Sequence, residues 1–480
     1  MKGRGIVFLM LPMWKPELVA PAGNREAAYA AFHYGADAIY LGLKSFSARA
    51  SAENFTLEEL DEIVAYANSC VPRRRIFVAL NTLILDRELD EIIKILDAIA
   101  LIGVDAVIVQ DTGIINIIKN YFHSLCIHVS TQAAAHSRSG IEQYEKWGCH
   151  RVVLARELSF DEISDIVRHS KIEVEVFIHG ALCYSYSGLC LFSSHKYGQS
   201  GNRGRCAYCC REIFYPDGRK DQMSLPFSMK DLAAGNELTK LAEIGVRAFK
   251  IEGRMKSPLY VSAVTDYYRR KIDGNLGDEE DELIADIKTI FSRPFISSYL
   301  FRKKEECATD FINVGHRGVI IGRVEKVIKD KNGGRWLCFV TSRDLEKHDG
   351  IQIDLPDIPR PYGFAVEELR ANGRGDVSVV KVLAGQVVKI KLPQNAPKLP
   401  AGAIIYCSSS QKVKRKFKYF IPKKGLFRRR YKLKLKIELL NKLIKVKARS
   451  EDLGFEVIVE EKGNFLPAQK PENTSKAFYN

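Results

Sequence analysis

Short apolar runs alternate with amphipathic stretches from Pro16 to about Ser292. Each run has the length of a buried strand. The runs cover residues 17–21, 38–42, 76–81, 106–110, 127–131, 152–156, 174–179 and 248–252. Between them, residues 57–68, 89–101 and 160–169 carry apolar positions at helical spacing, which predicts helices with one buried face.

Eight strand–helix units in one stretch predict an α/β fold, a (β/α)₈ TIM-like barrel over residues 16–292. Thr56 with Glu59, and Ser159 with Glu162, have the spacing of helix capping boxes. An open doubly wound sheet is the alternative architecture. No glycine-rich phosphate loop follows the first run, which disfavours that alternative.

After about residue 295 the pattern changes to short β-rich runs separated by Gly and Pro. These runs cover residues 319–327, 336–341, 350–355, 377–382, 386–392 and 403–407. They predict a small β-barrel domain over residues 312–410. Residues 411–480 follow as a basic β-like segment and a polar tail.

Positive charge is concentrated near the C-terminal end. The chain has 73 Lys and Arg against 58 Asp and Glu, a net charge of +15, and residues 412–436 hold thirteen of these cations and no acid. Aromatic residues lie between the cations, a pattern typical of nucleic-acid binding. The predicted RNA-binding residues are Lys414, Arg415, Lys416, Lys418, Arg428, Arg429 and Arg430. An alternating strand with lysines on its solvated face is the alternative interpretation.

Composition also bears on the compartment. Eleven cysteines in 480 residues do not suggest a secreted disulfide scaffold. No apolar run approaches the ~20 residues of a membrane span. Residues 1–13 resemble a short signal peptide, but no small-residue cleavage site follows, and Met13 is an alternative start. We therefore expect a cytoplasmic protein.

Polar residues end strand after strand of the predicted barrel, where barrel enzymes carry their active sites. Any one of them could cap a helix or bond a loop, but the set indicates a site lining. The set comprises Asn81, Gln110, Asp111, Gln132, Arg156, Glu157, His179, Glu252 and Arg254.

Four cysteines follow the seventh run in one glycine-rich loop: Cys183, Cys190, Cys206 and Cys210. Their spacing is C-x6-C-x15-C-x3-C, with Cys209 beside the last. Four thiolates suit zinc or an iron–sulfur cluster, and the wide first spacings favour a cluster. Four unrelated reduced thiols are the alternative.

Several phrases resemble collagenase-like peptidase family U-32. They are Glu175-Val-Phe-Ile-His-Gly180-Ala-Leu-Cys183, Gly188-Leu-Cys190, Gly201-Asn-Arg-Gly204-Arg-Cys206, Ser228-Met-Lys-Asp231 and Lys250-Ile-Glu-Gly-Arg254. The resemblance covers about residues 16–290, and a stretch from Gly315 is similar to the small β-domain of longer members. The best likeness is to the branch that makes 5-hydroxycytidine in 23S ribosomal RNA.

The resemblance implies oxygen-independent hydroxylation of an RNA base, a 23S rRNA cytidine or a tRNA uridine, with a [4Fe–4S] cluster and prephenate. It selects Cys183, Cys190, Cys206 and Cys210 as ligands, because Leu232 and Ala233 stand where some relatives have a cysteine. Cys209 is the less favoured fourth ligand. The partners would be ribosomal or transfer RNA.

Roles for the other residues follow from their places at strand ends. Arg156 and Arg254 would clamp a dicarboxylate donor, and Asn81 and Gln132 would line the substrate site. The catalytic candidates for proton transfer are Glu157, His179 and Glu252, with orientation of the cysteine loop as the alternative role of His179. Two alternative functions are a metal-dependent peptidase and a non-catalytic RNA-binding or assembly factor. The sequence shows no H-E-x-x-H zinc helix to support the former.

Overall fold

The computed structural model describes residues 15–216, 219, 224–297, 307–355, 361–371, 377–428, 432–440, 442–450 and 454–463. The chain divides into two compact units, Met1–Leu426 and Phe427–Asn480. Arg429, Arg430 and the polar C-terminal tail lie outside the described residues.

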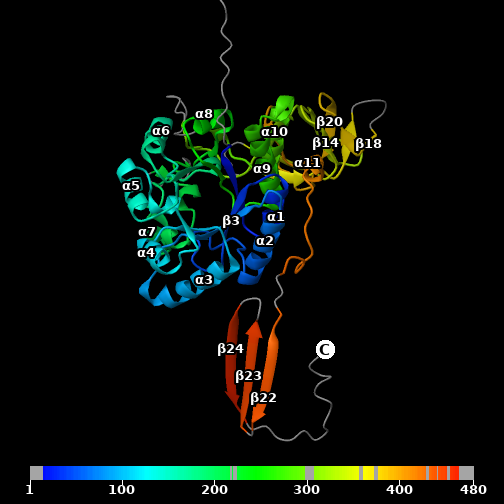
Figure 1. Cartoon of the computed structure of the whole chain (residues 1–480). Coiled ribbons are helices and arrows are strands. Elements are labelled where there is room, and N and C mark those ends of the chain that lie inside the picture. The colour runs from blue at the N-terminus through cyan, green and yellow to red at the C-terminus, as the bar shows by residue number, and fades with distance from the viewer. Residues whose placement is uncertain are drawn as a thin grey trace, which may run out of the picture. The chain divides into compact units, whose positions relative to one another are not determined.

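Eight parallel strands close into a barrel, as the alternation predicts (Figure 1). Each pairs with the next in the chain, β7 pairs with β9, and β9 pairs with β1 to complete the ring. The strands are β1 (Glu17–Ala22), β2 (Ala38–Gly42), β3 (Arg75–Leu80), β4 (Ala106–Val109), β5 (Cys126–Val129), β6 (Arg151–Val153), β7 (Glu173–Ala181) and β9 (Ala248–Ile251).

Helices follow most of the strands. They are α1 (Arg25–His33), α2 (Leu57–Ser69), α3 (Leu89–Ile102), α4 (Thr112–Tyr121), α5 (Arg138–Lys146), α6 (Phe160–His169), α7 (Phe192–Tyr197), α8 (Leu238–Glu243), α9 (Pro258–Asp273) and α10 (Glu280–Ile290). Helix α7 lies within the loop after β7. Both predicted capping boxes, at Thr56 and Ser159, are present and fix the starts of α2 and α6.

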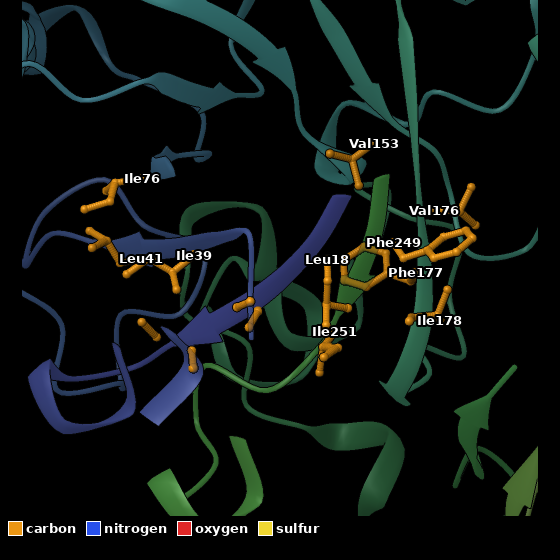
Figure 2. Packing of buried hydrophobic residues seen from close by; sticks show 14 of the residues in the cluster. Leu18, Ile39, Leu41, Ile76, Val153, Val176, Phe177, Ile178, Phe249 and Ile251 are labelled. Carbon is orange, nitrogen blue, oxygen red and sulfur yellow. The ribbon is translucent and has the colours of Figure 1, made fainter. Parts of the chain in front are cut away.

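The main core lies between the strands and these helices. Leu18, Ile178 and Phe249 come from neighbouring strands and pack together with almost no exposed surface (Figure 2). Inside the barrel, Arg151 donates to Glu17 at 2.7 Å and to Glu175 at 2.9 Å. This buried ion network lies at the amino-terminal ends of β1, β6 and β7.

Strand β7 extends past the barrel wall. Its end pairs antiparallel with β8 (Asp231–Ala233), which pairs with β10 (Phe295–Ile296). A bulge interrupts the β7–β9 register between Phe177 and His179. Ile178 is the extra residue, so side chains beyond it face the side of the strand opposite to the one that simple alternation predicts.

Antiparallel sheets follow the barrel and share a second core. Their strands are β11 (Val319–Arg323), β12 (Lys326–Lys329), β13 (Arg335–Val340), β14 (Leu345–Glu346), β15 (Gly350–Ile353), β16 (Tyr362–Ala365), β17 (Leu369–Ala371), β18 (Ser378–Val379), β19 (Lys381–Val382), β20 (Val387–Lys391) and β21 (Ile404–Ser409). The run expected over 377–382 is two strands in different sheets, because β18 pairs with β17 and β19 pairs with β14.

Helix α11 (Gln411–Lys416) and the residues after it return to the barrel. Val413 and Phe417 are buried in the main core, and Tyr34 donates a hydrogen bond to the carbonyl oxygen of Lys418. The second unit is one antiparallel sheet of β22 (Lys434–Leu440), β23 (Leu443–Ser450) and β24 (Phe455–Lys462). Among the described residues, no helix is long and apolar enough to cross a membrane.

Candidate functional site

A small cavity of about 60 Å³ lies at the carboxyl-terminal end of the barrel strands. Five of the polar residues predicted from strand ends line it. They are Asn81 after β3, Gln132 after β5, Arg156 after β6, and Glu252 and Arg254 after β9. The common rim of a parallel barrel brings together residues from distant parts of the chain.

Lys250 and Arg49 also line this cavity, and strand-end reasoning missed both. Lys250 points into the barrel from β9, donates to Glu175 at 2.6 Å, and its Nζ lies 4.3 Å from the centroid of the Tyr40 ring. Inward alternation along β9 could have identified Lys250. Arg49 comes from the irregular loop after β2, where no periodic pattern marks it.

The cavity is strongly cationic. Among the described residues, four cations and one carboxylate, that of Glu252, line it. An Arg49 nitrogen lies 3.7 Å from that carboxylate. Arg254 is 4% exposed, and burial lowers its pKa to about 10. Within the described structure, Nη1 of Arg254 and Nε of Arg156 are buried without an acceptor. Unpaired buried donors are costly, so these two arginines favour an anionic ligand.

The lack of a side chain at Gly42 leaves room for the Arg254 guanidinium. A Cβ at residue 42 would lie 2.0 Å from Arg254 Nη1 and 2.6 Å from Ser47 Oγ. Arg254 donates to that same hydroxyl at 2.5 Å. The guanidinium therefore occupies space that any larger residue at the end of β2 would fill.

The loop after β7 forms a second cavity, of about 460 Å³. Cys183, Cys190, Cys206, Cys209 and Cys210 all line it. Burial raises the pKa of Cys210 to about 11. Arg211 opposes this shift, while the thiols of Cys183, Cys206 and Cys190 reinforce it, which indicates that the four predicted ligands lie close enough to interact.

The donor set fits an iron–sulfur cluster better than one metal ion. Among the described residues, no three His, Cys, Asp or Glu side chains converge closely enough to bind a single ion. A four-iron cluster takes its thiolates on separate irons, so it needs several cysteines around one larger space. Cysteines around a cavity of about 460 Å³ meet that requirement.

Glu157 holds the cysteine loop and does not line either cavity. Its carboxylate accepts from the Ser187 backbone N–H and from the Ser187 hydroxyl, both at 2.9 Å. Gly188, with φ +76°, brings the loop against the Gln132 backbone, where a Cβ would lie 1.8 Å from the carbonyl oxygen. The loop is therefore fixed to the barrel rim at these two points.

His179 also lies away from both cavities. The bulge in β7 directs it toward α9, where Nδ1 lies 3.1 Å from the Tyr268 hydroxyl and the ring packs near Tyr260. It is 2% exposed, and burial lowers its pKa to about 4. Of the three candidates for proton transfer, Glu252 lines the barrel cavity, whereas Glu157 and His179 line neither cavity.

The two cavities are adjacent. Arg49, Gln132 and Arg156 line both of them. A molecule bound among the barrel cations would therefore lie next to the cysteine loop.

The predicted RNA-binding cations have different surroundings. Lys416 lies 2.8 Å from Asp286, and Arg415 lies 2.6 Å from Glu346. Lys414 and Lys418 are exposed and have no ion pair among the described residues. Arg428 is exposed in the second unit. Part of the basic segment therefore forms ion pairs with acidic residues of the same chain.

Residues 23–310 match the model of a family described as Peptidase family U32. A Bacillus subtilis protein named as a tRNA hydroxylation protein is 38% identical over 280 residues, or 56% of this chain and 66% of that protein. An Escherichia coli protein named as a 23S rRNA 5-hydroxycytidine synthase is 34% identical over 355 residues, or 70% of this chain and 52% of that protein.

A Porphyromonas gingivalis protein named collagenase is 32% identical over 307 residues, or 59% of this chain and 73% of that protein. The match thus spans less than two thirds of the length of the B. subtilis relative and about half of the E. coli one. The names of these relatives divide between RNA hydroxylation and proteolysis.

Proposed function

This chain belongs to peptidase family U32, and we propose that it hydroxylates a base of ribosomal or transfer RNA rather than cleaving peptides. The observation that carries the proposal is the cysteine-lined cavity beside a buried cationic pocket at the barrel mouth. The names of the B. subtilis and E. coli relatives support RNA as the substrate class.

Cys183, Cys190, Cys206 and Cys210 would hold a [4Fe–4S] cluster. When bound, it would supply electron transfer, or Lewis-acid chemistry if one iron lacked a protein thiolate. Cys206→Ala should lower the iron and acid-labile sulfide content of anaerobically purified protein, whereas Cys209→Ala should not. Equal iron in the wild type and Cys206→Ala would remove the cluster from the proposal.

The cationic pocket would hold one carboxylate of an anionic co-substrate, which by family likeness is prephenate. The pocket is small, about 60 Å³, so we place one carboxylate there rather than the whole molecule. The unpaired donors of Arg156 and Arg254 suit a carboxylate. The rest of the molecule would extend past Gln132 into the larger cavity.

Glu252 is the residue we assign to proton transfer. Among the described residues it is the only carboxylate that lines the pocket, and the Ala181 backbone nitrogen lies 3.4 Å from its Oε2. Glu157 would act indirectly by holding Ser187 and thereby the cysteine loop. His179 is a buried packing residue in this account.

A metal-dependent peptidase is the second candidate, because of the name of the P. gingivalis relative. Among the described residues, no three His, Cys, Asp or Glu side chains converge on one ion. A non-catalytic RNA-binding factor would need the cysteines only for structure.

The test of the proposed function is mass spectrometry of nucleosides from ribosomal and transfer RNA of a deletion strain. The proposal expects one hydroxylated pyrimidine to disappear and to return when the gene is restored. An unchanged nucleoside profile, with hydrolysis of a collagen-like peptide by the purified protein, would favour the peptidase.

A further inference from the structure

Three tyrosines and a leucine form an exposed rim on the cysteine cavity. Tyr184, Tyr186, Leu191 and Tyr208 all line that cavity, with exposed fractions of 51%, 65%, 68% and 41%. Large apolar side chains gathered on a surface beside a cavity indicate an interaction site. The proposed reaction leaves these four residues without a role.

The backbone and neighbouring side chains hold two of these rings in place. Tyr208 has φ +57°, a left-handed conformation that bulky residues rarely adopt, and its hydroxyl lies 3.0 Å from the Met255 sulfur. The Tyr184 ring meets Phe227 edge-on at 4.9 Å between centroids. The Tyr186 side chain is 65% exposed and makes no hydrogen bond or ring contact with the described residues. The rim therefore presents positioned rings with uncovered surface.

Cations accompany the rim. Arg205 is next to Cys206, is exposed, and forms no ion pair within the described residues. Gly204, beside it, packs on the loop after β2, where a Cβ would lie 2.3 Å from the Ser47 carbonyl oxygen. Arg49 from that same loop lines the cavity. Positive groups beside aromatic rings match the alternating phosphates and bases of a single nucleic-acid strand.

We propose that Tyr184, Tyr186 and Tyr208 form a stacking platform for unpaired bases of single-stranded RNA at the cysteine cavity. Leu191 adds apolar contact, and Arg205 contacts phosphate. The choice of RNA rests on the proposed function. Enzymes that modify bases act on single strands or turn the base out of the helix, because stacking and pairing hide its reactive atoms.

The site differs from the basic segment that the sequence predicted. Arg415 and Lys416 of that segment already contact Glu346 and Asp286. The tyrosine rim instead lies on the cavity where the chemistry is proposed. A base stacked on Tyr184 or Tyr186 would therefore be held beside the cysteines.

The experiment is fluorescence anisotropy of the full chain with a short, labelled, single-stranded RNA and with the same sequence as a duplex. Tyr186→Leu removes the ring and keeps apolar volume, whereas Tyr186→Phe keeps the ring. Tyr121, 76% exposed at the C-terminal end of α4, gives the matched control Tyr121→Leu. Helix ends of this kind lie at the opposite end of the barrel from the strand ends.

The expected result is about tenfold weaker binding of the single strand by Tyr186→Leu, with wild-type affinity in Tyr186→Phe and Tyr121→Leu. The duplex should bind more weakly than the single strand. If Tyr186→Leu and the wild type bind the single-stranded RNA with equal affinity, the platform proposal is wrong. It is also wrong if the protein binds a denatured polypeptide that the single-stranded RNA does not displace.

This test does not depend on turnover. If the deletion strain keeps all hydroxylated nucleosides but Tyr186→Leu still binds the single-stranded RNA more weakly than the wild type, the proposed function fails and the platform stands. If hydroxylation is lost in the deletion strain but Tyr186→Leu binds RNA normally, the platform alone fails.

Discussion

Gly42→Ala should weaken anion binding without removing any charge from the site. The new methyl carbon would lie 2.0 Å from Arg254 Nη1, and Arg254 is only 4% exposed, so the guanidinium must shift or the strand must distort. Overpacking of this kind costs about 1–3 kcal/mol. The melting temperature should fall by about 2–4 °C for each kcal/mol lost from the free energy of unfolding.

The larger effect is expected on binding. A charge-assisted hydrogen bond contributes about 1.5–3 kcal/mol, so displacing Arg254 from a carboxylate should weaken affinity by roughly 10- to 150-fold. Isothermal titration calorimetry with prephenate measures this directly. Gly315→Ala is the control, because a Cβ at Gly315 meets nothing within 4 Å. Wild-type affinity in Gly42→Ala would refute the assignment of Arg254 to the anion.

Three further predictions concern other parts of the chain. Arg151→Met leaves buried Glu17 and Glu175 without their shared partner, so the free energy of unfolding measured in urea should fall by about 3–5 kcal/mol. The control Arg138→Met breaks an exposed ion pair and should lower it by less than about 1 kcal/mol. The folded pKa of His179, about 4, is below its ordinary value of ~6.5, so protonation favours the unfolded chain. Stability should therefore fall by on the order of 3 kcal/mol as pH drops from ~6.5 to ~4, and His179→Gln should flatten this slope in urea denaturation at several pH values. Charge reversal of Lys414 and Lys418 together should reduce the slope of log RNA affinity against log salt by about one or more in anisotropy titrations, and an unchanged slope would mean that neither contacts phosphate.

The barrel could be predicted because every strand repeats one local pattern. Apolar runs such as 106–110 are too short for helices, and turns such as Gly103, with φ +81°, end the helices between them. Once the strands are parallel, their ends must share a rim. The meeting of Asn81, Arg156 and Arg254 at one cavity follows from topology alone.

The remaining features of the site depend on tertiary detail. Simple alternation after Phe177 would direct His179 inward, but the bulge in β7 redirects it onto α9. Arg49 reaches the cavity because its loop folds over the rim, and no residue pattern encodes that path. Counting charges could not show that Lys416 contacts Asp286, because the acid lies 130 positions away in the chain.

The most direct test of the central claim measures hydroxylated nucleosides in a deletion strain that carries the wild type, Cys206→Ala or Cys209→Ala. The two variants remove neighbouring thiols of the same cavity, and only Cys206 is assigned to the cluster. The account predicts that wild type and Cys209→Ala restore the missing hydroxylated pyrimidine, while Cys206→Ala, made to the same level, does not. Full restoration by Cys206→Ala would contradict RNA hydroxylation at this cysteine site.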